Sequence, residues 1–223
     1  MAGYMVVDPV TVIATHLMET IKKYAHELLT RQDVQRLLDR LRERYPALVD
    51  DLVPNVVPLG TVQKVLQNLL REGVPIRDMV TILETLADHA QTTKDPVLLT
   101  EFVRRALGRT ICKELVDENG VLNVLTLSPE IEKAIADSIQ ERDGTTFMAL
   151  HPETARRIVN GVANAIAKLG QLQTQPILIC AEPLVRPFLK GLVERFIPGV
   201  VVLSYEEVPP EVEIRSMGTV EMG

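Results

Sequence analysis

The sequence predicts a helix-rich α+β protein of several subdomains, with a helical middle and a C-terminal α/β part. Two observations indicate this class. Apolar residues recur at helical spacing through residues 9–112, and β-branched runs then alternate with helical segments. The 223 residues are 46% apolar and 24% charged, which is ordinary globular composition. Because aromatic residues make up only 4% and tryptophan is absent, the core must be aliphatic.

The N-terminal segment predicts one short strand followed by one long helix. Residues 4–7 form a short apolar run, and apolar residues then recur at i, i+3 and i+4 as far as Leu28. Asp8 is placed to cap this helix, and Pro9 suits its first turn. An isolated strand leaves its backbone polar groups unpaired, so we expect its sheet partners to lie upstream.

Residues 29–112 show helical patterns without strand-like alternation, which predicts a small helical bundle. Thr30 and Asp33 resemble a capping box, with aspartate in place of the usual glutamate or glutamine. Gly73 is placed to end one of the helices, and Asp78 to open the next. We expect the helices to begin at about residue 31 and to cover 48–52, 59–70, 79–86 and, as one longer helix, 98–111.

The remaining residues, 113–223, predict an α/β unit with an open mixed sheet and flanking helices. Asn119-Gly120 is a strong turn signal and predicts a hairpin between a strand at Val116 and a second strand over 121–127. Later segments alternate between strand and helix patterns, which implies right-handed crossovers. The expected strands are 177–180, 200–205 and an edge strand at 212–217, and the expected helices begin near Pro129, Pro152 and Leu184.

Composition and charge exclude several functional classes. The net charge of −6 provides no basic field for a phosphate backbone, so we expect no nucleic-acid partner. No stretch approaches the roughly 20 apolar residues that span a bilayer, and no signal-peptide pattern opens the sequence. Two cysteines cannot form a disulfide framework, which fits a reducing cytoplasmic compartment.

Motifs for catalysis or cofactor binding are absent from the sequence. There is no glycine-rich phosphate loop and no Gly-x-Ser-x-Gly elbow, and the four histidines lack metal-ligand spacing. We therefore predict no catalytic residue, no cofactor and no metal. Cys180 is the one candidate nucleophile, since it ends a predicted strand where open α/β sheets place ligands. A thiol or hydrolase-like enzyme is the alternative that it leaves open, although a buried strand end is the favoured interpretation.

Two polar clusters are the candidate interaction sites. Thr11, Thr15 and His16 lie at the start of the first predicted helix, where threonine either bonds to the preceding turn or lines a groove. A second group surrounds a tight connection between two helices and either fixes that turn or contacts a subunit or partner. It consists of Gln67, Asn68, Arg71, Arg77 and Asp78.

Several segments together resemble the flagellar and type III export-gate family, FHIPEP. They are GYMVVDPVTVIATHL at 3–17, RQ at 31–32, DLVP at 51–54, KVLQNLL at 64–70, VPIRDM at 74–79, TILETLA at 81–87, ALGR at 106–109 and VVVLS at 200–204. The segment ATHL at 14–17 usually reads differently in the virulence branch of the family, so the flagellar branch is favoured.

This resemblance implies a non-enzymatic docking platform: the cytoplasmic domain of a bacterial inner-membrane protein in flagellar protein export. Residues 1–28 would be the remnant of a split first subdomain, 29–112 a helical subdomain and 113–223 the C-terminal α/β subdomain. The implied partners are export chaperones with their cargo, components of the ATPase complex, the export switch protein and further copies of the protein in a ring. In the family, the threonine of the Ala-Thr-His segment belongs to the chaperone site, which carries over to Thr15.

Overall fold

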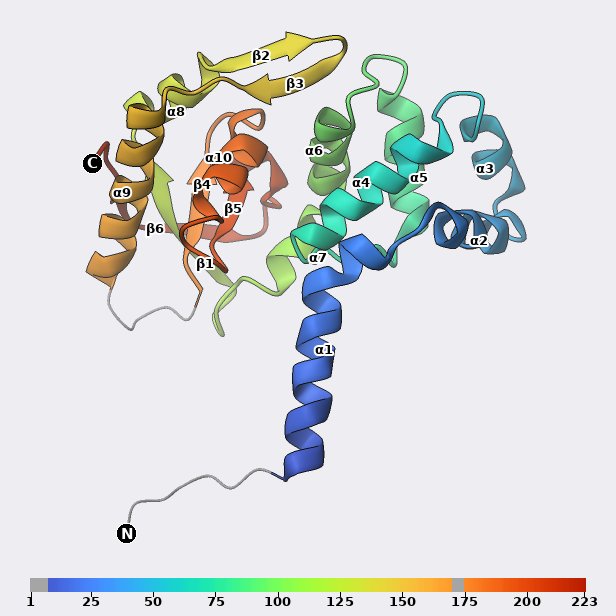
Figure 1. Ribbon diagram of the computed structural model, residues 1–223, viewed down its shortest axis with the longest axis horizontal. Coiled ribbons are helices and arrows are strands. Elements are labelled where there is room, and N and C mark those ends of the chain that lie inside the picture. Colours follow the sequence, from blue (N-terminus) through green and yellow to red (C-terminus); the bar gives the residue numbers. More distant parts are fainter. Residues whose placement is uncertain (1–7, 170–174) are drawn as a thin grey trace. The chain divides into compact units, whose positions relative to one another are not determined.

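The computed structural model describes residues 8–169 and 175–223 (Figure 1). The chain divides into two compact units, Met1–Ala87 and Asp88–Gly223. The strand expected at 4–7 lies outside the described residues. The three-part division expected from the sequence stays a prediction, because two compact units neither confirm nor exclude it.

The first unit consists of helices in its described part. They are α1 (Pro9–Leu28), α2 (Arg31–Arg42), α3 (Pro46–Leu52), α4 (Leu59–Arg71) and α5 (Met79–His89), whose last two residues belong to the second unit. Local sequence accounts for their ends. The carboxylate of Asp8 accepts from the backbone N–H groups of Val10 and Thr11, and Thr30 and Asp33 form the predicted capping box. Gly73 follows α4 with a φ of 75°, a left-handed conformation that favours glycine.

An aliphatic core holds α2 to α5 together. Its members, all fully buried, include Val34, Leu38, Val49, Val62, Val65, Leu66, Leu69, Ile82, Leu83 and Leu86. They recur at the i, i+3 and i+4 spacing seen in the sequence, so the predicted core of this region is confirmed. No residue of α1 is buried.

The second unit contains a four-stranded sheet and a separate hairpin. Its helices are α6 (Pro96–Ala106), α7 (Gly108–Lys113), α8 (Pro129–Ala136), α9 (Pro152–Leu169), α10 (Val185–Val193) and the short 3-10 helix η2 (Tyr205–Glu207). Its strands are β1 (Val121–Leu127), β2 (Ile139–Arg142), β3 (Thr145–Met148), β4 (Ile177–Cys180), β5 (Val201–Ser204) and β6 (Glu213–Val220). The predicted fold class, a helical region followed by an α/β unit, is confirmed.

The main sheet has the order β5-β4-β1-β6, and all its neighbouring strands run parallel. The antiparallel pairing lies instead in the separate β2–β3 sheet. Helix α10 packs against β5 and α9 against β6, and α10 also contacts α8 and α9. One apolar cluster joins these three helices to the strands, with Ile135, Val162, Leu178 and Leu189 among its members.

The hairpin predicted at Asn119-Gly120 does not form. Strand β1 is bonded to β4 on one edge and to β6 on the other, so neither edge can accept a hairpin partner. The turn is held by the carboxylate of Asp117, which accepts from the N–H groups of Asn119 and Val121. The hairpin of this unit lies at Asp143-Gly144, where both residues have positive φ and join β2 to β3.

The single helix expected through 98–111 is two helices, α6 and α7. The break at Leu107 places Gly108 against the backbone of η2. A Cβ atom on Gly108 would lie 2.1 Å from the carbonyl oxygen of Glu207. The thiol of Cys112 also donates to that oxygen, at 3.7 Å. Contact with a segment about one hundred residues away therefore decides where the helix breaks.

Candidate functional site

The first predicted cluster lies on α1, whose residues are exposed except for the half-buried Ala25 and His26 near its C-terminal end. Thr11 belongs to the helix cap, since its hydroxyl donates to Oδ2 of Asp8 at 2.9 Å and its backbone N–H donates to the same oxygen at 3.0 Å. These bonds hold the pKa of the Asp8 carboxyl below its usual value, with the Thr11 backbone bond as the largest cause. Thr15 and His16 are exposed.

The three residues do not share one face of α1. Thr11 and Thr15 are four residues apart and lie one above the other, whereas His16 is about 100° further round the helix. A separate apolar stripe runs at i, i+3 and i+4 spacing along another side. It consists of Val10, Ile13, Leu17, Ile21, Tyr24 and Leu28, which are 41–72% exposed. Helix α1 therefore presents a threonine face and an apolar face.

The second predicted cluster is partly structural. The side-chain amide of Gln67 donates to the carbonyl oxygen of Leu29 at 3.1 Å, which ties the end of α1 to α4. Asp78 caps α5 by accepting from the N–H and the hydroxyl of Thr81. Asn68 is half-buried, while Arg71 and Arg77 are exposed around the turn. The turn-fixing interpretation thus applies to Asp78, whereas Gln67 joins α1 to α4, and Arg71 and Arg77 stay candidates for a partner contact.

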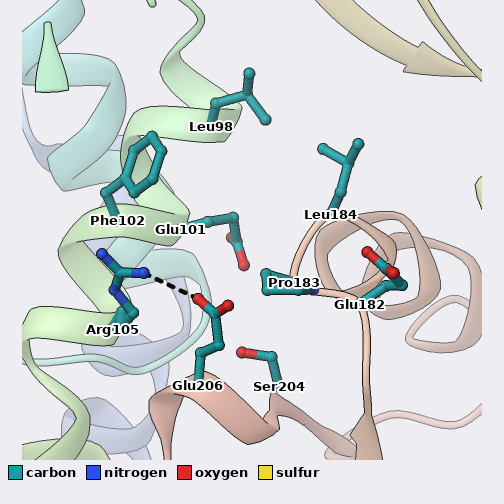
Figure 2. A pocket seen from close by; sticks show the side chains of 9 residues that line it. All are labelled: Leu98, Glu101, Phe102, Arg105, Glu182, Pro183, Leu184, Ser204 and Glu206. Carbon is teal, nitrogen blue, oxygen red and sulfur yellow. Dashed lines mark hydrogen bonds and ion pairs between the residues drawn. The ribbon is translucent and has the colours of Figure 1, made fainter. Parts of the chain in front are cut away.

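The second unit contains a recess that sequence analysis did not predict. It lies at the carboxyl ends of β4 and β5, has a volume of about 380 Å³ and is bounded by three segments (Figure 2). One wall is a face of α6, the second is the loop from β4 to α10, and the floor is formed by the end of β5 and by η2. The lining residues are Leu98, Glu101, Phe102, Arg105, Glu182, Pro183, Leu184, Ser204 and Glu206.

Phe102 is held firmly in the α6 wall of this recess. The His89 ring stacks on it with centroids 3.9 Å apart and planes 2° from parallel. The guanidinium of Arg105 lies 5.8 Å from the Phe102 ring centroid and donates to Glu206 at 3.0 Å. Phe102 therefore forms a fixed part of the recess wall.

Two buried ion pairs lie next to the recess. Arg186 is fully buried and binds both carboxylate oxygens of Glu101, and Arg104 donates to Glu207 at 2.6 Å with both side chains buried. Burial raises the pKa of the Glu101 carboxyl, and the charge of Arg186 opposes that effect. These pairs join α6 to α10 and to η2, so they hold the α6 wall of the recess in place.

Both cysteines are buried in this unit. The thiol of Cys180 donates to the carbonyl oxygen of Leu203 at 3.3 Å, and burial raises its pKa. Burial also raises the pKa of Cys112 to about 11. A nucleophilic cysteine needs an accessible thiol with a lowered pKa. The structure therefore contradicts the alternative in which Cys180 is a nucleophile, and supports the interpretation of a buried strand end.

Comparison with known proteins places the chain in a family. The FHIPEP family model matches residues 1–213. The chain belongs to the FHIPEP family. The flagellar biosynthesis protein FlhA of Bacillus subtilis is 46% identical over 222 residues, which are 100% of this chain and 33% of that protein. The FlhA of Escherichia coli K12 is 42% identical over 98% of this chain and 31% of its own length.

Solved structures of other family members have the same fold. The structure of the Chlamydia pneumoniae CdsV and CdsO protein complex matches with a TM-score of 0.88 and 32% identity, over 96% of this chain and 63% of that one. The nonameric SctV-C of EPEC matches with a TM-score of 0.83 and 30% identity, over 93% and 62%. The curated FlhA relatives are longer than these solved structures. The FHIPEP chain described here spans about one third of their length.

Two further observations concern the described residues of this FHIPEP chain. No helix within 8–169 or 175–223 is both long and apolar enough to cross a membrane. In the same ranges, no group of three or more histidine, cysteine, aspartate or glutamate residues is placed to hold a metal ion.

The recess of the second unit could not be predicted from the sequence, because its lining residues come from three distant segments. The only sequence signal was the i, i+3, i+4, i+7 row of Leu98, Glu101, Phe102 and Arg105.

Proposed function

We propose that this chain forms part of the cytoplasmic docking platform of the bacterial flagellar type III export apparatus, within a protein of the inner membrane. Membership of FHIPEP supports an export role. The flagellar branch is supported by identities of 46% and 42% to two FlhA proteins, against 32% and 30% to CdsV and SctV-C. A virulence-type export gate is the alternative, and the genes adjacent to this one would separate the two.

The exposure of α1 is the observation that carries this proposal. A helix of 20 residues with no buried residue has two faces available for contacts. The apolar stripe from Val10 to Leu28 is too extensive to stay in water, and a protein of the relatives' length has further chain to cover it. The threonine face is then left to line a groove beside the covered stripe. We infer that export chaperones with their cargo bind there, with Thr15 at the contact.

Self-association would multiply such sites. The SctV-C of EPEC is nonameric in its solved structure, and CdsV has been solved in complex with CdsO. We infer a ring of this chain's full-length protein, which would present many copies of the α1 site and raise avidity without new contacts. Components of the ATPase complex and the export switch protein are the further partners that we propose for this platform.

The test is a calorimetric titration of flagellar export chaperones, with and without cargo, into the full cytoplasmic region. Thr15→Lys and Thr15→Met should weaken binding by about 1–2 kcal/mol, the usual effect of an interface residue at a contact. Thr145→Lys is the matched control, because Thr145 is also an exposed threonine but lies on β3. Unchanged affinity of every chaperone for both Thr15 variants would remove Thr15 from the site.

A further inference from the structure

We propose that the recess of the second unit is a docking site for an arginine or lysine side chain of a partner polypeptide. The recess is the cavity of about 380 Å³ at the carboxyl ends of β4 and β5. Open α/β sheets bind ligands in the crevice outside the carboxyl ends of their strands. The proposal is independent of the α1 site, since it involves other residues in the other compact unit.

Apolar walls select the stem of the occupant. Leu98 and Phe102 project from α6 on one side, and Pro183 and Leu184 from the loop on the other (Figure 2). The long stems of lysine and arginine pack on apolar surface while their charged heads stay in contact with water or acids. The stacking of His89 behind Phe102 preorganises one wall, so little ordering is needed on binding.

Carboxylates select the head of the occupant. Glu182 is exposed at the recess, and within the described residues its carboxylate makes no hydrogen bond or ion pair. Glu206 shares its charge with Arg105, and Glu101 is neutralised by Arg186 behind the wall. One uncompensated negative charge thus remains, and it belongs to Glu182. A cation completes this site, whereas an anion would meet Glu182 without a counter-charge.

The openness of the site favours a side chain over a free small molecule. Arg105, Glu182 and Glu206 are all exposed, so the mouth of the recess is in contact with water. Small ligands usually bury about 70–90% of their surface. A side chain enters with its backbone still outside, and arginine is enriched among the residues that dominate protein interfaces. The net charge of −6 would also steer a basic segment toward this chain.

The test uses two pentapeptides that differ only in charge. Acetyl-Ala-Leu-Arg-Leu-Ala-amide and the same peptide with citrulline in place of arginine are titrated into the chain. The Leu98 and Leu184 methyl signals are followed in proton–carbon correlation spectra. We expect saturable shifts, with the arginine peptide binding roughly fivefold more tightly than the citrulline peptide and losing that advantage as salt rises. Butylguanidinium, which lacks a backbone, should bind more weakly than the arginine peptide.

Two charge-matched variants locate the effect. Glu182→Gln should abolish the roughly fivefold preference for arginine, because it removes the uncompensated charge. Glu141→Gln changes the same charge on exposed β2 and should leave binding unchanged. Equal binding of the two peptides, or an arginine preference that survives Glu182→Gln, would overturn the proposal. Butylguanidinium binding as tightly as the arginine peptide would also overturn it, in favour of a small cation. None of these outcomes depends on Thr15, so the α1 proposal stands or fails separately.

Discussion

The two compact units use charge differently. In the first unit, Arg42 pairs with Asp39 and Asp50 on the surface, where all three side chains are 39–59% exposed. In the second unit, Arg186 is 0% exposed and pairs with Glu101, which is 10% exposed. The first unit therefore depends mainly on its aliphatic core. The second adds charged groups that only their partners can satisfy.

This difference affects how well each unit tolerates single substitutions at charged positions, more than it affects the total stability of the unit. A buried ion pair gains little over a well-packed apolar pair, because both ions lose their hydration. Removing one partner is costly, since it leaves a charge without solvent or counter-charge. The second unit should therefore be sensitive to single changes at its charged positions, and the first unit should be nearly indifferent to them.

Replacing Arg186 should cause the largest loss of stability among the substitutions that compare the two units. Arg186→Met should lower the free energy of unfolding by about 3–5 kcal/mol, because Glu101 is left buried and unpaired. Arg42→Met should lower it by about 1 kcal/mol or less, because its two pairs are exposed. Urea unfolding followed by far-ultraviolet circular dichroism measures both values.

A double variant separates the buried charge from lost packing. Arg186→Met combined with Glu101→Met removes both charges and should recover most of the loss. If the double variant were as unstable as Arg186→Met, packing by the arginine stem would explain the effect instead of charge. Amide hydrogen exchange in β1 and in α4 reports separately on the second and first units.

Two glycines extend the comparison to the backbone. Gly108→Ala should destabilise by about 3 kcal/mol, because its Cβ would lie 2.1 Å from the Glu207 carbonyl oxygen and force the backbone of η2 or α7 to move. Gly73→Ala in the first unit should cost only about 1 kcal/mol, since its φ is 75° but nothing lies within 4 Å. Equal losses in urea unfolding would mean that η2 yields easily at this contact.

Alkaline pH should weaken the second unit selectively, since it contains both cysteines. Burial raises the pKa of Cys112 from 9.0 to about 11, so between these values the folded state binds more protons than the unfolded state. The free energy of unfolding should therefore fall as pH rises through this range, by roughly 2 kcal/mol for Cys112. Burial of Cys180 acts in the same direction.

The cysteine effect has a direct control. Unfolding measured against pH in Cys112→Ala should lose only part of this alkaline slope, because Cys180 contributes at least as much, and the double variant with Cys180→Ala should lose the whole thiol contribution. A slope that is unchanged in the double variant would assign the effect to other groups. At neutral pH, neither thiol should react with iodoacetamide in the folded chain.

Local signals explain what could be predicted from the sequence. Asp8 and Thr30 bond to residues two or three positions away, so the caps and helices that they start were correctly predicted. The break before Gly108 and the missing hairpin partner of β1 depend on contacts with η2 and β6, which no local pattern encodes. Arg186 and Glu101 are 85 residues apart, so their pairing was likewise invisible.

The candidate sites show the same difference between local patterns, which the sequence reveals, and contacts between distant residues, which it does not. Thr15 was expected either to bond to the preceding turn or to line a groove. It is exposed on α1, and its role in binding stays a prediction. Leu98 and Phe102 lie at helical spacing, and only the placement of α6 opposite the loop from β4 to α10 makes that row one wall of a recess. Glu182 follows Cys180 by two residues, and the loop that carries it gives no indication of the helix it faces.

The smallest contrast tests two helix caps. Thr30→Ala in the first unit should destabilise by about 1 kcal/mol, because the Thr30 hydroxyl accepts from the Asp33 N–H and the loss opens the capping box. Ser128 stands at the same position of α8, yet its buried hydroxyl has no hydrogen-bond partner among the described residues. Ser128→Ala should therefore change the free energy of unfolding by less than about 0.5 kcal/mol, or stabilise the chain, since it removes an unsatisfied buried group. A loss at Ser128 as large as that at Thr30 in urea unfolding would require a partner for its hydroxyl. The cap would then stabilise both units alike, and the contrast between them would rest on the buried ion pairs, the close contact of Gly108 and the buried thiols.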